Sequence, residues 1–522
     1  MSGPGDSFLL ARRWRTESPS AGAHRDGIHE RSPGRLEATT ASVWSPPPMR
    51  QGSSEPWIRE EASRLSSLAL PIVLTNVLWM LVGTVDIAML GRYGDEALAA
   101  ASLSSVWVHM TQMLGMGLVM GMDPMVTQGH GARDREALGR ALQRGVVVAL
   151  LASVPVVALR FLTEEFLGLV RAGAAALTGD RAADALASLD LDALERLAAP
   201  AEEYAVIQSI GTPFFLVFIA LRQYLQGRGI LRPALVVTVL ANLFNAVGNW
   251  ALIFEFDLGI RGAGLATGLT RVFMALTLLV FVLRARLQRG AWVPWDAESL
   301  RWSGIARTLR YGFPIALHFV FEVGAFGATT LLAGCLGVTA TVAHAASINL
   351  ASLTFMIPLG VALAATTRIG NLVGERRFER AQGSAWVAMA MAAGVMAALG
   401  LVLFAGRHLL PSFYTSEPAA LALAASVLPI AAAFQVFDGL QVAGSGILRG
   451  MGRTTPPAVF NFIAWWVIAL PVAAWFVLRR GDGLQMIWWA LVLGLGIVAA
   501  AECLWLRARG PRSLAPEAPS GR

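Results

Sequence analysis

The sequence predicts an all-α polytopic membrane protein whose twelve transmembrane helices form two six-helix lobes. Of its 522 residues, 55% are hydrophobic and only 15% are charged, and the mean hydropathy is +0.57. Such a balance is typical of chains that cross a membrane many times. In addition, residues 311–374 match residues 68–131 at a constant offset of 243 positions without a gap, which indicates a duplicated unit.

Small and helix-bending residues carry the duplication, so shared hydrophobic composition alone does not explain it. The acids inside the apolar runs do not follow it, because Glu322 has Trp79 as its counterpart and Asp86 has Thr329. The acids are therefore candidates for function. The matched pairs include Pro71 with Pro314, Gly91 with Gly334, Gly117 with Gly360 and Gly131 with Gly374.

Twelve apolar runs are long enough to cross a bilayer, whose core of about 30 Å needs about 20 helical residues. The first six lie at 66–90, 98–126, 137–162, 204–226, 232–254 and 262–285. The second six lie at 311–336, 343–368, 381–405, 421–448, 456–478 and 484–507. Because each repeat holds an even number of spans, equivalent helices run in the same direction. The lobes should then be related by a pseudo-two-fold axis along the membrane normal.

We predict four regions along the chain. They are a disordered cytoplasmic tail at 1–56, an N-lobe at 57–290, a C-lobe at 291–507 and a disordered tail at 508–522. The first tail is rich in Ser, Pro, Gly and Arg and cannot bury enough apolar surface to fold.

The connection at 163–203 is long and acidic, with three arginines against nine acids. We interpret it as an exposed insertion, and a partner-binding or regulatory role is the alternative.

Basic residues predict the orientation of the helices. Arginines follow the second, sixth and eighth spans, whereas the connection after the seventh span carries no charge. By the positive-inside rule, both termini and the even-numbered connections face the cytoplasm, and the protein lies in the cytoplasmic (inner) membrane. These loops explain the formal net charge of +7, so nucleic acid is not an expected partner.

Three acids lie inside apolar runs, where an ionised carboxylate costs about 2.5–3.5 kcal/mol on insertion scales. Glu322 lies deep in its span, with His318 one turn earlier on the same face and no Lys or Arg at the i+4 position. Asp438 precedes Gln441 by three residues. Asp86 lies close to the end of its run, so capping of a loop at the interface is an alternative role for it.

Uncharged polar residues accompany these acids. Asn245 and Asn249 are spaced i, i+4, and Thr267 and Arg271 repeat that spacing in the next span. Amide and hydroxyl groups can ligate a small hard cation or hydrogen-bond to a carboxylate, although such asparagines more often hold helices together. For His318, a hydrogen-bonded core position is the commoner role of a helical histidine, and a proton relay is the alternative.

Several chemistries have no residues to perform them. The sequence holds no HExxH, Walker or GxSxG motif, and Cys335 and Cys503 lie in separate apolar runs. Hydrolysis, ATP-driven transport and zinc catalysis are therefore not expected. We predict a protein that is not an enzyme and that needs no cofactor beyond a coupling ion.

Four segments are recognisable in order along the chain, namely GTVDIAMLGRYGDEALAAASL, GMGLVMGMDPMVTQGHGA, GFPIALHFVFEVGAF and FQVFDGLQVAGSGILRG. Together they resemble the multidrug and toxic compound extrusion (MATE) family, specifically its NorM-like bacterial branch. The similarity runs from about residue 60 to residue 507. It implies a monomeric secondary antiporter that exports small organic cations in exchange for Na+ or H+ by alternating access, surrounded by membrane lipids.

The resemblance also implies roles for individual positions. Coupling and substrate binding fall to Glu322, Asp438 and Asp86. The supporting polar residues are Asn245, Asn249, Thr267, Gln441 and His318, and Pro71 is the helix-bending proline. Na+ could be held at Glu322 and Asp438, or at Asp86, Asn245 and Asn249.

A lipid-linked oligosaccharide flippase is the alternative function, because it can share a two-lobe architecture. Such a flippase should line its cavity with arginines that hold a pyrophosphate, whereas the deep ionisable groups considered above are mostly acids. A membrane scaffold or an uncoupled channel is disfavoured, since buried carboxylates would then cost stability without a role.

Deleting residues 2–50 should leave export per inserted molecule unchanged, because the composition of this segment cannot support a packed core. Efflux of ethidium from cells that express each form, normalised to the protein in the membrane, measures this. A large loss of export in the shortened chain would show that the tail takes part in transport.

Overall fold

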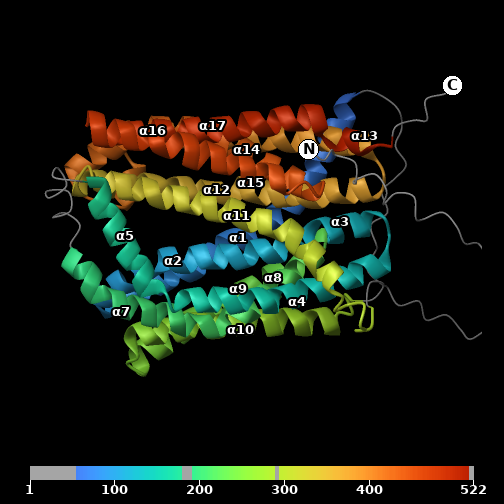
Figure 1. Ribbon diagram of the computed structural model, residues 1–522, viewed down its shortest axis with the longest axis horizontal. Helices are drawn as coiled ribbons and strands as arrows, with labels where there is room; N and C mark the ends of the chain where they lie inside the picture. Colours follow the sequence, from blue (N-terminus) through green and yellow to red (C-terminus); the bar gives the residue numbers. More distant parts are fainter. Residues whose placement is uncertain (1–53, 179–190, 289–292, 482, 517–522) are drawn as a thin grey trace, which may run out of the picture. The chain divides into compact units, whose positions relative to one another are not determined.

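The computed structural model describes residues 54–178, 191–288, 293–481 and 483–516 as helices joined by short connections (Figure 1). The predicted tail at 1–56 lies almost entirely outside these residues, as does the middle of the 163–203 connection. No strand occurs in the described part of the chain. Helices are expected for long apolar runs, because a helix satisfies its own backbone hydrogen bonds inside a bilayer.

The elements divide between the two halves of the chain. Those of the first half are α1 (Ser54–Tyr93), α2 (Asp95–Met120), α3 (Asp123–Gly131), α4 (Arg135–Arg160), α5 (Thr163–Thr178), α7 (Leu191–Gln208), the 3-10 turn η3 (Ser209–Gly211), α8 (Thr212–Gly227), α9 (Arg232–Asn249), the π-helix η4 (Trp250–Glu255) and α10 (Gly259–Arg284). Those of the second half are α11 (Trp302–Gly334), α12 (Val338–Gly374), α13 (Phe378–Ala405), the 3-10 turn η5 (Leu410–Phe413), α14 (Pro418–Gly450), α15 (Thr455–Phe462), the π-helix η6 (Ile463–Ala469), α16 (Leu470–Ala474), the π-helix η7 (Trp475–Arg480), α17 (Leu484–Arg509) and the 3-10 turn η8 (Pro511–Leu514).

Eleven of the described helical segments are long and apolar enough to cross a membrane. The predicted span at 98–126 is not among them. Its residues form α2 and α3, with an interruption at Gly121 and Met122. Ala, Ser and Gly make up much of α2, which packs against α11, α4 and α7. A helix enclosed by other helices can be less apolar than one that faces lipid, and α2 supplies the twelfth span of the two-lobe fold.

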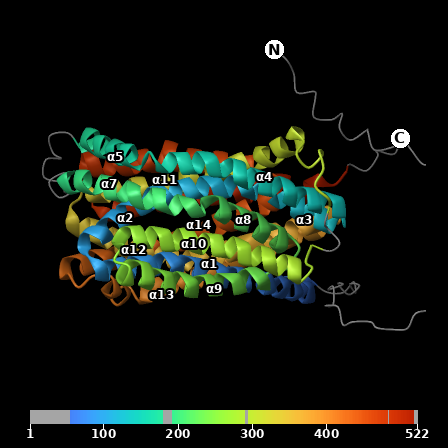
Figure 2. The same ribbon diagram turned by 90° about the horizontal axis from the view of Figure 1, so that it is seen from below.

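Two regions predicted to be irregular are helical. In the 163–203 connection, α5 and α7 pack on each other, with the backbone N–H of Glu164 donating to Glu202 Oε2 at 3.1 Å. Figures 1 and 2 place both helices at the end of the bundle opposite α3. In the predicted tail at 508–522, α17 continues to Arg509 and η8 follows it. An ion pair of 2.7 Å between Arg512 and Glu379 holds η8 against α13.

Each half has its own hydrophobic core, and a third core joins the halves. The first is built mainly from α2, α4, α8 and α10, and the second mainly from α11, α14, α17 and η6. The third places α1 against α12, α13 and α14. It includes Ile72 of α1, Met120 of α2 and Ile315 of α11.

The junction between the halves repeats the 243-residue offset of the sequence. A Cβ atom on Gly117 would overlap with the backbone of Ala316, and one on Gly360 would overlap with Val73. Gly360 lies 243 residues after Gly117, and Ala316 lies 243 residues after Val73. Helix α2 therefore meets α11 as α12 meets α1, which is the arrangement of a pseudo-two-fold axis with parallel halves.

A second pair of contacts follows the same offset nearer to one end of the bundle. A Cβ on Gly131 would overlap with the carbonyl group of Asn371, and one on Gly374 with that of Gln128. Only glycine allows two helix backbones to approach so closely. We call this the basic-loop end, defined by the connections at 132–134, 285–288, 293–301 and 375–377 that lie beside α3 (Figure 1).

Polar contacts reinforce the junction at the basic-loop end. Arg368 of α12 makes an ion pair of 2.6 Å with Glu61 of α1, and Ser384 of α13 donates to the same carboxylate at 2.8 Å. Gln128 of α3 donates to the carbonyl oxygen of Gly450 on α14 at 3.0 Å. In the linker before α11, the pKa of Asp296 is lowered to about 2 by hydrogen bonds from Ser299 and from Arg140.

The change Gly131→Ala should loosen the junction, because overpacking between two backbones costs about 1–3 kcal/mol. Thr127 is buried at the same junction, so a cysteine placed there by Thr127→Cys becomes accessible to a labelling reagent when the junction loosens. We expect a water-soluble maleimide to label that site about tenfold faster when Gly131→Ala is also present.

The matched control for this experiment is Gly83→Ala, because a Cβ on Gly83 would meet no atom within 4 Å. Labelling of the chain without Thr127→Cys subtracts the signal of Cys335 and Cys503. Equal labelling rates with Gly131→Ala and with Gly83→Ala would contradict a tight junction at Gly131.

Candidate functional site

One polar cluster in the first half surrounds Asp86 on α1. Asn245 and Asn249 of α9 donate to Asp86 Oδ1 at 3.0 and 2.5 Å, and Thr267 of α10 donates to Oδ2 at 2.5 Å. The i, i+4 spacing also lets Asn249 donate to Asn245 at 3.1 Å. All four side chains are buried. The structure thus brings together the four residues of the first half that were grouped from the sequence.

Arg271 lies one turn after Thr267 on α10 and faces the same region. Its guanidinium donates to Gln208 Oε1 at 3.1 Å and lies over the ring of Phe215, 5.7 Å from the centroid. It also attracts the Asp86 carboxylate electrostatically. Asp86 is therefore surrounded by three neutral donors and one nearby cation, which partly offset the cost of burying its negative charge.

A second cluster, in the other half, is centred on His318 and Glu322 of α11. His318 Nε2 lies 3.4 Å from Glu322 Oε2 and 3.5 Å from Gln441 Nε2 of α14. Its Nδ1 lies 3.0 Å from Asn461 Nδ2 of α15. His318 is 4% exposed and Glu322 is 9% exposed. The histidine is thus a hydrogen-bonded core residue that also contacts the acid.

Asp438 completes the second cluster from α14. It is 3% exposed, and its carboxyl group lies close enough to that of Glu322 for the two to repel each other when both are ionised. Within the described residues, no arginine offsets the burial of Asp438. Asp438 therefore receives less compensation than Asp86, which has three donors and one nearby cation.

Both clusters offer oxygen ligands to small cations. No group of three or more His, Cys, Asp or Glu that could hold a metal ion occurs in the part of the chain that the structure describes. Na+, a hard cation, can use carboxylate, amide and hydroxyl oxygens instead. Asn249 Oδ1 is buried without a partner beside Asp86, so Asp86, Asn249 and Thr267 could supply such a set.

Some buried charged residues were not identified from the sequence. Asp123 of α3 accepts from Gln223 at 2.9 and 3.0 Å, and Glu502 of α17 accepts from Ser445 at 2.6 Å. Arg160 of α4 is 0% exposed and donates to Gln112 at 3.2 Å. Each is a charged residue inside an apolar run, the same signal that identified Glu322. The interior therefore holds arginines as well as acids.

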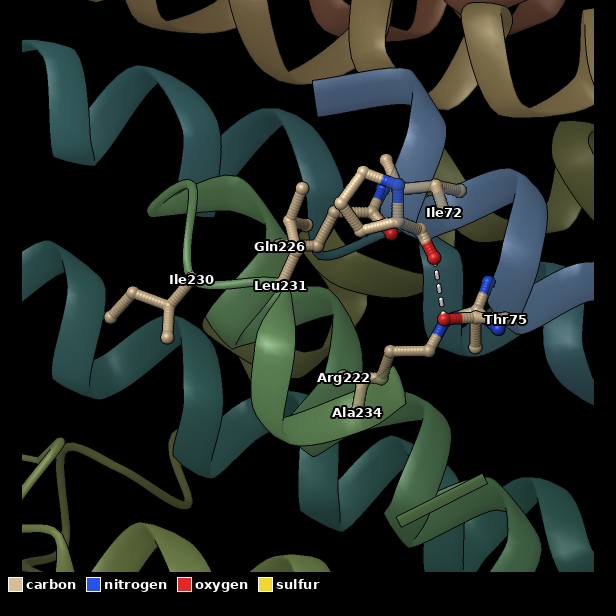
Figure 3. Close-up of a pocket in the computed structure, with 8 residues that line it drawn as sticks. Ile72, Thr75, Arg222, Gln226, Ile230, Leu231 and Ala234 are labelled. Carbon is tan, nitrogen blue, oxygen red and sulfur yellow. Dashed lines mark hydrogen bonds between the residues drawn. The ribbon is translucent and has the colours of Figure 1, made fainter. Parts of the chain in front are cut away.

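A small pocket lies beside Pro71 (Figure 3). Thr75 donates to the carbonyl oxygen of Pro71 at 2.7 Å on the α1 side of the pocket. Arg222 and Gln226 of α8 face it, and Ile230, Leu231 and Ala234 complete its wall. A proline inside a helix weakens the backbone hydrogen-bond ladder, so α1 has both a weak point and free space next to it.

Comparisons with known proteins agree on one family. The MatE family model matches residues 71–251 and 314–475. "Multidrug resistance protein NorM" of Vibrio parahaemolyticus is 31% identical over 86% of this chain and 96% of its own length. "Probable multidrug resistance protein NorM" of Mesorhizobium japonicum is 32% identical over 86% of this chain and 94% of its own length. The crystal structure of the eukaryotic MATE transporter AtDTX14 has the same fold, with a TM-score of 0.79 and 21% identity over 88% of this chain and 98% of that one.

Replacing Asn249 by Ala should lower the midpoint of thermal unfolding in detergent, because Asp86 loses a donor and hydrogen bonds to charged groups contribute about 1.5–3 kcal/mol. Asn349→Ala is the matched control, since Asn349 is exposed and donates only within its own helix, to Ala345. Equal effects of the two replacements on the midpoint would show that the Asp86 cluster does not stabilise the fold.

Proposed function

Because this chain belongs to the multidrug and toxic compound extrusion (MATE) family, we propose that it is a secondary antiporter that exports organic cations in exchange for H+ or Na+. The observation that carries the mechanism is the pair of buried acids Glu322 and Asp438, which repel each other when both are ionised. Glu322 contacts His318 and is attracted by Arg449, whereas no arginine offsets the burial of Asp438 within the described residues. Two such acids attract any available positive charge.

The coupling step follows from competition for these acids. A proton, a Na+ ion and a cationic substrate can each neutralise Glu322 and Asp438, and each excludes the others when it binds. Loading an ion from one side of the membrane then releases the substrate, and the reverse exchange resets the site. The membrane potential adds about 2.3 kcal/mol per elementary charge per 100 mV to the drive.

Alternating access requires a junction that can open and close. The glycine contacts at Gly117, Gly131, Gly360 and Gly374 close the halves near the basic-loop end, which the positive-inside rule places in the cytoplasm of the cell. The closed junction supports a state in which the acids are reached from the opposite side. Opening it would expose them to the cytoplasm, from which the substrate cation is taken.

The Asp86 cluster is a second cation site in this proposal. Asn245, Asn249 and Thr267 already orient the carboxylate, so Na+ or a proton could bind without large rearrangement. Pro71 lies on the same helix, fifteen residues before Asp86, with the pocket of Figure 3 beside it. Bending of α1 at Pro71 would move Asp86 relative to its partners.

The remaining assignments follow from the same chemistry. We propose that the protein works as a monomer in the cytoplasmic membrane, with both termini in the cytoplasm, and that it needs no cofactor beyond the coupling ion. A lipid-linked oligosaccharide flippase is not favoured. The half-buried Arg271 is engaged by Gln208, and the relatives are multidrug resistance proteins by name.

Glu322→Gln and Asp438→Asn should insert and fold normally yet lose gradient-driven export of ethidium, by about tenfold or more. The amide side chains keep the size of the acids but cannot exchange a proton or neutralise a cation. Asp95→Asn is the matched control, because Asp95 is exposed at the start of α2. Export at the parental rate by both variants, at normal membrane levels, would refute the mechanism.

A further inference from the structure

Glu502 of α17 is a carboxyl group that the mechanism above leaves unused. It is 0% exposed, and the backbone of α14 passes so close that a Cβ on Gly444 would overlap with it. Its Oε1 accepts from Ser445 Oγ at 2.6 Å, and its Oε2 has no partner within the described residues. Glu502 is thus an enclosed acid with a single neutral donor.

The surroundings of Glu502 oppose a negative charge. Burial of an ion costs several kcal/mol even after relaxation, and one hydroxyl group cannot offset this. Glu322 of α11 repels a negative charge on Glu502, and the neighbouring thiol of Cys503 cannot neutralise that charge. The guanidinium of Arg449 on α14 lies over the ring of Phe319, 5.6 Å from the centroid.

The burial of Glu502 and its single neutral donor therefore favour the neutral carboxylic acid over the carboxylate. Because Oε1 accepts the hydrogen of Ser445, the acid hydrogen of Glu502 sits on Oε2. The group holds a proton in the half of the protein that contains the two proposed coupling acids. No other role of Glu502 follows from its contacts, since a hydrophobic residue would fill the same space at a lower cost.

One face of α14 links Glu502 with the coupling acids. Asp438, Gln441, Ser445 and Arg449 are spaced by three, four and four residues, so they follow one another along the same side of the helix. Gln441 contacts His318, which contacts Glu322. Ser445, one turn further toward the basic-loop end, contacts Glu502. His318 and Gln441 thus lie between the coupling acids and Glu502.

We propose that Glu502 is a third proton-carrying acid, which relays protons between the Glu322–Asp438 pair and the basic-loop end. Glu502 first gives its Oε2 proton to water at that end, and its carboxylate then takes up a proton that Glu322 has released to His318. The His318 ring can accept and donate a proton, whereas the Gln441 amide only orients that ring. The first transfer breaks the O–H bond of Glu502 and forms one on water. In the second, the O–H bond of Glu322 breaks as an N–H bond forms on the His318 ring, and that N–H bond breaks as the O–H bond of Glu502 forms again, with no change in oxidation state. The inference rests on the proposed function, because it adds a step to the same coupling.

The test uses the full chain in liposomes, with tetraphenylphosphonium as the transported cation. Efflux driven by an imposed pH gradient is compared with exchange of labelled for unlabelled probe in the absence of any gradient. We expect Glu502→Gln to slow the gradient-driven efflux by about tenfold or more while exchange stays at the parental rate. Glu502→Asp, which can still carry a proton, should recover part of the efflux, and Asp95→Asn should change neither rate.

Several results would overturn the relay. These are parental gradient-driven efflux in Glu502→Gln, an equal loss of efflux and exchange in both Glu502 variants, and a parental protein that responds to a Na+ gradient only. The last result would leave the antiporter proposal intact. A parental protein that exports the probe under neither gradient would instead refute the proposed function, so the two failures are distinguishable.

Discussion

A carboxyl group inside an apolar helical bundle must be neutralised or surrounded by donors, and the two halves of this chain meet that constraint in different ways. Around Asp86, three side chains from α9 and α10 donate to the carboxylate, so the charge is compensated by fixed dipoles. Around Glu322 and Asp438, the acids repel each other, and within the described residues Arg449 attracts Glu322 but no arginine offsets the burial of Asp438. The second arrangement has a high affinity for mobile positive charge, which is what a coupling site needs.

In this duplicated architecture, the residues that form the contacts between the halves differ from the acids that bind protons and cations. Glycines kept at the 243-residue offset form the contacts between the halves, as the pairs Gly117 with Ala316 and Gly360 with Val73 show. The acids break the offset, because Glu322 and Asp86 have no acidic counterparts. Symmetric contacts can open and close together, whereas asymmetric acids give the two halves different affinities for protons and cations.

Much of the fold could be predicted from the sequence, because long apolar runs and a gapless repeat leave few alternatives. The Asp86 cluster was also accessible, since i, i+4 spacing fixes which side chains share a helix face. What the sequence could not supply was the pairing of distant helices. Nothing in the residues around Glu502 indicates that it meets Ser445. The 163–203 connection was interpreted as an exposed acidic insertion, and nothing in its residues indicates that α5 and α7 pack on each other. The interruption of the second span at Gly121 likewise depends on its packing against α11.

Competition between protons and a cationic ligand for the same buried acids is the central claim, and equilibrium binding measures it most directly. Purified protein would be titrated with tetraphenylphosphonium at a series of values from about pH 5 to about pH 9, where buried carboxyl groups can titrate. The account predicts that the Kd rises as the pH falls, with a slope that approaches about tenfold per pH unit when one proton is displaced. A Kd that stays constant across this range, in protein that binds the probe, would contradict it.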